Sequence, residues 1–111
     1  MKQTTPELLE SLQNILTQRL LAYILAISDG RIVGDFIRGT IKPLPPTEYR
    51  IHQLHTLVYD FAKNEDRATI QSWFLGIKEE LNDRCPAEWL HQNFDEALPL
   101  VQDQLQKLSQ L

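Results

Sequence analysis

Three kinds of side chain in the sequence could support chemistry: a pair of histidines, one cysteine and clustered acids. His52 and His55 lie three residues apart, a spacing that places two imidazoles on one face of a helix and could bind a metal ion. A zinc site needs further ligands, and none stands at a familiar spacing. The sequence therefore predicts surface or partly packed histidines and no metal site.

The cysteine and the acids have equally plain interpretations. Cys85 directly precedes a proline-started helix, a position that lowers a thiol pKa, but no base or oxyanion-binding group accompanies it. The acids of residues 79–83 and the pair Asp95-Glu96 are typical of solvent-facing helices and turns, and the pair stands near a helix start, where negative charge is favoured. There is no glycine-rich phosphate loop. We therefore expect no catalytic residues and no cofactor.

A further candidate chemistry is DNA binding by residues 24–39, ILAISDGRIVGDFIRG, whose pattern predicts a helix, a turn and a second helix ended by Gly39. The candidate DNA contacts are Arg19, Ser28, Arg31, Arg38 and Lys42. The second helix, however, carries Asp29 and Asp35 beside its two arginines. Two alternatives stay open: a helix that reads DNA, and a helix-turn-helix that is structural or binds protein.

Length, composition and charge bound the class of protein. The chain has 111 residues, 42% of them hydrophobic, which suits one compact folded domain. Residues 1–42 hold five bases and four acids, a net charge of +1, while residues 43–111 hold six bases and eleven acids, a net charge of −5. Only the first part suits DNA, and the acidic remainder suits a protein partner.

Two observations concern location. No apolar run approaches the roughly 20 residues that cross a bilayer, so we expect no membrane partner. The first residues lack the apolar core of a secretory signal, and the single Cys85 cannot form an internal disulfide. The sequence therefore predicts a cytoplasmic protein.

The elements that would position these residues are all helical. Apolar spacing predicts about seven helices, no strand is indicated, and the fold class is therefore all-α. Caps are expected at Thr5, Thr17, Ser28 or Asp29, and Asn64 or Asp66, and Pro86 is expected in the first turn of a helix. The prolines of residues 43–46 break the chain, Thr47 restarts it, and the next helix places Ile51, Leu54, Leu57, Val58 and Phe61 on one stripe.

An ordered set of residues in the second half carries a family resemblance. Trp73-Phe74 is followed by Leu81, by Pro86 at the start of a helix, and by Leu90, within the segment WFLGIKEELNDRCPAEWL. Together with the upstream helix-turn-helix, this spacing resembles the Xre/MbcA/ParS-type antitoxins over residues 18–108. Where the family usually has a glycine after the leucine, this chain has Asp83.

Asn82-Asp83 nevertheless tolerates the left-handed backbone that a turn would need. The sequence departs from the family in two further respects. The segment GIKEE replaces a proline-rich loop, and Pro99 is expected to interrupt the last helix. We expect a helix-turn-helix region in residues 1–42 and a toxin-binding-like helical region in residues 43–111, joined in one compact unit.

The resemblance implies an antitoxin-like protein that binds and neutralises a cognate toxin, such as a RES-class enzyme that degrades NAD. It also implies a homodimer and repression of its own operon through operator DNA. The candidate toxin contacts are Arg84, Glu88, Trp89, His91 and Gln92. Two alternatives stay open: a stand-alone helix-turn-helix transcription regulator, and a repurposed protein-interaction module that binds neither DNA nor toxin.

Overall fold

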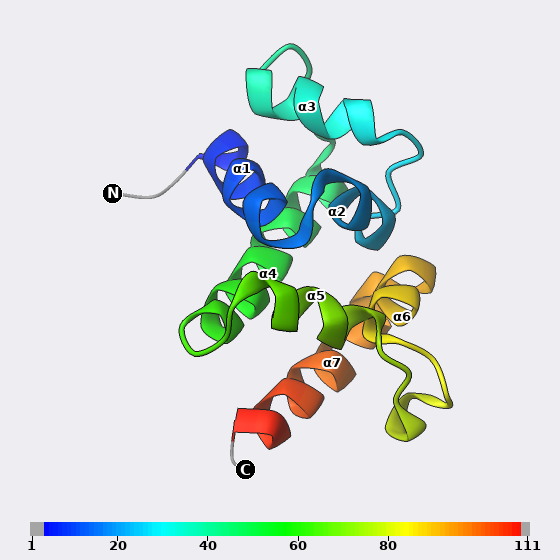
Figure 1. The fold of residues 1–111 in the computed structure, drawn as a ribbon. Helices are drawn as coiled ribbons and strands as arrows, with labels where there is room; N and C mark the ends of the chain where they lie inside the picture. The colour runs from blue at the N-terminus through cyan, green and yellow to red at the C-terminus, as the bar shows by residue number, and fades with distance from the viewer. Residues whose placement is uncertain (1–3, 110–111) are drawn as a thin grey trace.

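The computed structural model describes residues 4–109, and the side chains of residues 4–107. This part of the chain contains seven α-helices, one 3-10 helix and no strand, which confirms the expected all-α class (Figure 1). The helices are α1 (Thr5–Leu16), α2 (Gln18–Ile24), α3 (Gly30–Arg38), α4 (Pro45–Ala62), α5 (Arg67–Leu75), η1 (Glu79–Leu81), α6 (Pro86–Gln92) and α7 (Phe94–Ser109).

Two threonines define the first two helices. Thr4, rather than the expected Thr5, caps α1: its hydroxyl accepts a hydrogen bond from the Glu7 amide at 3.4 Å. Thr5 is instead free to donate its hydroxyl to the Glu48 carboxylate at 2.9 Å, which ties α1 to α4. Thr17 ends α1 and caps α2, as expected, with the Leu20 amide 3.3 Å from its hydroxyl.

Helix α3 begins and ends as the sequence predicts. Asp29 is the N-cap, and its carboxylate accepts from the Arg31 amide at 2.9 Å. Gly39 ends the helix with φ 77°, in the left-handed region that glycine enters without steric strain. The buried residues Val33 and Phe36 hold α3 against the rest of the molecule.

Two proline expectations are wrong in detail. Helix α4 begins at Pro45 rather than at Thr47, because prolines in the first two helical positions lose no intrahelical hydrogen bond. Its buried stripe is the expected one, from Ile51 to Phe61. Helix α7 runs through Pro99 without a break, although Pro99 lies in its second turn and has no amide hydrogen to donate there.

The connection between α5 and α6 is a short irregular segment with its own fixed backbone. The amide of Lys78 donates to the carbonyl of Arg84 at 3.1 Å, which closes the segment as an isolated bridge around η1. Asn82 and Asp83 both adopt left-handed backbone, with φ of 58° and 60°. The expected turn at Asn82-Asp83 is therefore confirmed.

One core joins the first and second halves of the chain. Helix α1 packs against α3, α4 and α5, and α2 packs against α6. The fully buried side chains include Leu9, Leu12 and Leu16 of α1 together with Leu54 of α4 and Phe74 of α5. None of the described helices is both long enough and apolar enough to span a membrane.

Candidate functional site

The exposed face of α3 carries two arginines, each paired with a nearby carboxylate: Arg31 with the N-cap Asp29, and Arg38 with Asp35 of the same helix. Arg31 Nη2 lies 2.7 Å from Asp29 Oδ2, and Arg31 Nε donates to the same oxygen at 3.0 Å. Arg38 Nη2 lies 2.5 Å from Asp35 Oδ1. Each arginine is therefore already paired within the protein when a partner approaches. The two arginines and the two carboxylates together carry no net charge.

The pairing at the start of α3 also shifts two pKa values. Hydrogen bonds from the Arg31 guanidinium, with a smaller contribution from the Arg31 amide, lower the pKa of Asp29. The same carboxylate raises the pKa of Arg31. Asp29 is thus ionised at neutral pH, and a DNA phosphate that approached Arg31 would also approach this negative charge.

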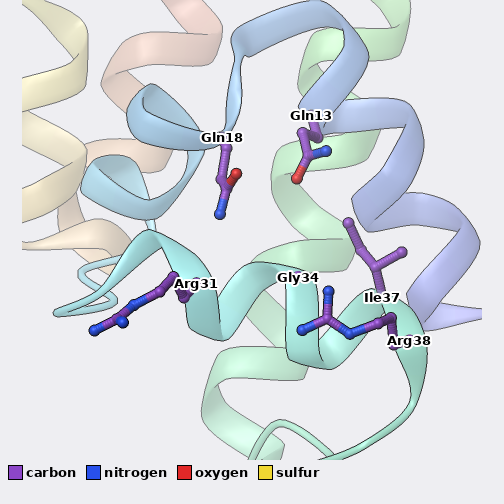
Figure 2. A pocket seen from close by; sticks show the side chains of 6 residues that line it. All are labelled: Gln13, Gln18, Arg31, Gly34, Ile37 and Arg38. Carbon is purple, nitrogen blue, oxygen red and sulfur yellow. The ribbon is translucent and has the colours of Figure 1, made fainter.

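A first hollow lies where the end of α1 and the start of α2 face α3 (Figure 2). Its volume is about 270 Å³, and Figure 2 shows Gln13 and Gln18 directed toward α3, with the Arg38 guanidinium lying back along α3 over Gly34. A Cβ atom on Gly34 would lie 3.2 Å from Arg38 Nη1. Buried Gln13 Oε1 has no hydrogen-bond partner among the described residues, so this hollow contains one unsatisfied acceptor.

A second and larger hollow, the α2–α6 hollow, has a volume of about 660 Å³. Three of the predicted DNA-binding residues, Arg19, Ser28 and Arg31, line it, together with His91 from the predicted toxin-binding set. The structure thus brings together residues that the sequence assigns to different partners. Lys42 is exposed in the connection between α3 and α4 and lines neither of these two hollows.

His91 lies apart from the other predicted toxin contacts and lines the α2–α6 hollow. Its ring stacks on Tyr23 of α2, with centroids 4.2 Å apart and planes 11° apart, and its Nδ1 lies 2.7 Å from the Tyr23 carbonyl oxygen. Burial raises the pKa of the Tyr23 hydroxyl, and the nearby Glu88 and Cys85 raise it further. Tyr23 therefore stays a neutral phenol at physiological pH.

Three other predicted toxin contacts form a chain of hydrogen bonds along α6. Arg84 Nη1 donates to Gln92 Oε1 at 2.5 Å, and Gln92 Nε2 donates to Glu88 Oε1 at 3.4 Å. The Arg84 guanidinium also lies over the ring of Trp89, 5.9 Å from its centroid. Arg84 is therefore held close to α6 by one hydrogen bond and one cation–π contact.

Trp89 is half-buried rather than freely exposed, and it packs against the core. Its indole Nε1 donates to the Leu81 carbonyl at 2.5 Å. The Leu81 side chain is 1% exposed. Trp89 therefore fixes the α5–α6 connection to α6, which is a supporting role for that connection.

Two exposed aliphatic residues that the sequence did not single out lie in this connection, which we call the tip segment (residues 75–84). Leu75 is 58% exposed and Ile77 is 73% exposed, on either side of Gly76. Figure 1 shows the tip segment extending away from the neighbouring helices at the lower right. The available signal was the apolar run Trp73, Phe74 and Leu75, followed after Gly76 by a further apolar residue, Ile77, beyond the end of the helix.

The remaining candidate chemistry groups are separate. His52 Nε2 lies 3.4 Å from the Thr5 hydroxyl, while His55 stacks on Tyr59 with centroids 5.5 Å apart. Burial, followed by the nearby His52, lowers the pKa of His55. Across the described residues, no group of three or more histidine, cysteine, aspartate or glutamate side chains is placed to hold a metal ion. Cys85 is a free, half-buried thiol.

Comparison with known proteins finds no relative of this chain. No protein-family model, no curated protein and no solved structure matches the chain.

Proposed function

We propose that this chain is an antitoxin-like protein that binds a toxin protein through the tip segment and neutralises it. The observation that carries the proposal is the pair of exposed aliphatic residues, Leu75 and Ile77, on a backbone held at both ends. Aliphatic side chains presented in this way lose contact with water when they enter a partner's pocket, and a fixed backbone reduces the entropy lost on binding.

The supports of the tip segment agree with this role. The bridge between Lys78 and Arg84 closes it, the buried Leu81 anchors it, and Trp89 holds the Leu81 carbonyl. Of these residues, Leu81 belongs to the set on which the resemblance to the toxin-binding domain rests, together with Trp73-Phe74, Pro86 and Leu90. Such an arrangement fixes the backbone so that the side chains of Leu75 and Ile77 stay exposed and do not pack into the core.

The charges beside the two aliphatic residues indicate the kind of partner. Glu79, Glu80 and Asp83 are exposed within the same segment. The two bases of the segment are engaged locally, because the Lys78 ammonium lies 5.4 Å from the Trp73 ring centroid and Arg84 is held by Gln92. A partner with an apolar pocket and a basic rim therefore fits best, and an active site that binds an anionic substrate has such a rim. A RES-class enzyme is the first partner to test.

The test is co-expression of the chain with the product of its neighbouring gene, read as rescue of growth and as co-elution in gel filtration. Ile77→Asp should abolish both readouts, because a buried aspartate without a partner is strongly unfavourable. Leu44→Asp is the matched control: Leu44 is 73% exposed, as Ile77 is, but lies at the start of α4. Rescue by Ile77→Asp at the unaltered level, or no complex with any neighbouring product, would show that the proposal is wrong.

Operator binding and homodimerisation remain predictions of the resemblance. The ion pairs of Arg31 and Arg38 disfavour DNA binding by a single copy, so a dimer would have to combine two weak half-sites. A gel-shift titration with the DNA upstream of the gene measures this directly. If the protein is an operator-binding dimer, Arg31→Ala weakens the shift and the affinity falls steeply with salt.

A further inference from the structure

The α2–α6 hollow has the size of a small-molecule site. Its volume of about 660 Å³ lies within the range of about 300–1,000 Å³ that is common for ligand pockets. Its wall combines an apolar part, which includes Ala22 and Ile27, with aromatic and cationic side chains. The tip segment does not contribute to it, so ligand binding in this hollow is independent of the proposed toxin binding.

One side of the hollow offers aromatic surface. Tyr23 and His91 both line it and lie parallel, 4.2 Å apart, so they already form a two-ring stack. Tyr23 keeps 40% of its surface exposed, which leaves aromatic surface on which a third planar ring can lie. Stacking on an aromatic side chain favours flat ring systems of any base composition.

The lining of the hollow also offers positive charge, although the protein as a whole has a net charge of −4. Its lining includes two guanidinium groups, of Arg19 and Arg31, and one carboxylate, that of Asp29. Arg19 takes part in no ion pair within the described residues. The bonds of Arg31 to Asp29 use Nε and Nη2, so Nη1 remains available as a donor.

We propose that the α2–α6 hollow binds a mononucleotide, with its base stacked beside Tyr23 and its phosphate held chiefly by the unpaired Arg19, while Nη1 of Arg31, which is not used in the bonds to Asp29, is a second donor. A mononucleotide joins a planar ring to a phosphate within one molecule, and the hollow provides a partner for each part. The Ser28 hydroxyl, which also lines the hollow, is an additional donor for the phosphate or the ribose.

The test is a titration of the ¹⁵N-labelled full chain with AMP, followed by the amide signals of residues 18–31 and of His91. AMP should shift these signals in a saturable way, while adenosine alone and inorganic phosphate alone should each bind at least about tenfold more weakly, since each makes only part of the contacts. Equal affinity for AMP and inorganic phosphate, or shifts that lie elsewhere in the chain, would overturn the proposal.

Two variants separate the two parts of the ligand. Arg19→Gln should weaken both AMP and inorganic phosphate by about fivefold, because it removes the unpaired charge. Tyr23→Leu should weaken AMP and leave inorganic phosphate unchanged, and it keeps the backbone carbonyl that faces His91. Arg67→Gln is the control for charge, since Arg67 is exposed at the start of α5 and outside the hollow.

A parallel titration with the hexanucleotide dT6 decides between a free nucleotide and a nucleic acid. The proposal requires AMP to bind by itself. If dT6 binds at the same amides and AMP does not, the site accepts single-stranded DNA and the mononucleotide assignment is wrong. If Arg19→Gln and Arg67→Gln weaken AMP equally, the binding is non-specific charge attraction, and the assignment is again wrong.

Discussion

A single carboxylate at the start of α3 determines what that helix presents. Asp29 caps the helix through the Arg31 amide at 2.9 Å and pairs with the Arg31 guanidinium at 2.7 Å. The capping bond stabilises the helix, and the ion pair removes the free charge from its exposed face. The acids that look misplaced for DNA recognition are therefore explained by the local structure of the helix itself.

The first prediction concerns pH. Hydrogen bonds lower the pKa of Asp29 and, through the Thr69 amide, that of Asp66, the N-cap of α5. A carboxyl whose folded-state pKa lies below its unfolded value of about 4 stabilises the fold above that pH, and this stability is lost as the pH falls toward the folded-state pKa. Asp29→Asn with Asp66→Asn should therefore flatten the decline of stability below about pH 4.

The measurement is urea unfolding at a series of pH values between 2 and 7, followed by circular dichroism. Asp103→Asn with Asp60→Asn is the control, because these carboxylates form exposed ion pairs within helices and cap none. An unaltered pH profile in the Asp29 and Asp66 double variant would mean that the caps do not act through their charge.

At the scale of the element, the backbone conformation of α3 at Gly34 is one that any residue can adopt, so glycine is not required there. Gly34 has helical conformation, and a Cβ there would meet only the far end of Arg38, at 3.2 Å. Because that guanidinium belongs to a flexible side chain that is 65% exposed, it can move aside. Gly34→Ala should raise the free energy of unfolding by up to about 1 kcal/mol through helix propensity.

Gly39→Ala gives the opposite expectation on the same helix. Its φ of 77° lies in the left-handed region, where a Cβ is strained although nothing lies within 4 Å of it. The free energy of unfolding should fall by about 1 kcal/mol. Thermal melts of the two variants beside the parent chain test both, and a loss of stability in Gly34→Ala would mean that Arg38 is held in place.

The joint between α1 and α2 stores strain at Thr17. This residue has φ 78° and ψ 155°, a region that only glycine occupies readily and that strains a β-branched residue by about 1–3 kcal/mol. Glycine is also nearly as good an N-cap. Thr17→Gly should therefore raise the free energy of unfolding by about 0.5–1 kcal/mol, even after the greater entropy of the unfolded chain.

Thr17→Ala distinguishes the contribution of backbone strain from the contribution of the N-cap hydrogen bond. It keeps a Cβ and loses the hydroxyl that accepts from Leu20, so it should destabilise the protein by about 1 kcal/mol. Denaturant midpoints of both variants provide the comparison. If glycine and alanine destabilise the chain equally, the hydroxyl dominates at this joint and the backbone strain is small.

Element boundaries were predictable where one residue type has one local use. Asp29, Gly39 and Pro86 stand where the sequence predicts, since capping and proline geometry are local. Adjacent candidates were harder: Thr4 caps α1 in place of Thr5, because Thr5 bonds to Glu48, 43 residues away. A preference decided by a distant partner cannot be read from neighbouring residues.

At the scale of the whole molecule, the candidate sites were less predictable than the elements. The pairing of Arg38 with Asp35 follows from a spacing of three on a helix. The stack of His91 on Tyr23 joins residues 68 positions apart, and only the packing of α6 against α2 creates it. The exposure of Leu75 and Ile77 likewise depends on where the chain leaves the core.

The packing predicts that both halves of the chain unfold together. Gln71 of α5 donates to the Ile15 carbonyl of α1 at 2.7 Å, so even the polar contacts cross between the halves. Phe74, which is fully buried, lies where α5 joins this common core. Phe74→Ala should lower the free energy of unfolding by about 3–5 kcal/mol, through lost burial and the cavity that remains.

Leu75→Ala is the matched control, because Leu75 adjoins Phe74 but is 58% exposed; it should change stability by less than about 0.5 kcal/mol. The fluorescence of Trp73 and Trp89 reports on the second half, and the amide signals of α3 report on the first. In Phe74→Ala both probes should shift to the same lower urea midpoint, as a two-state domain requires. If α3 unfolds at an unchanged midpoint while the tryptophans respond, the first three helices are stable by themselves, and the common core does not couple them to the tip segment.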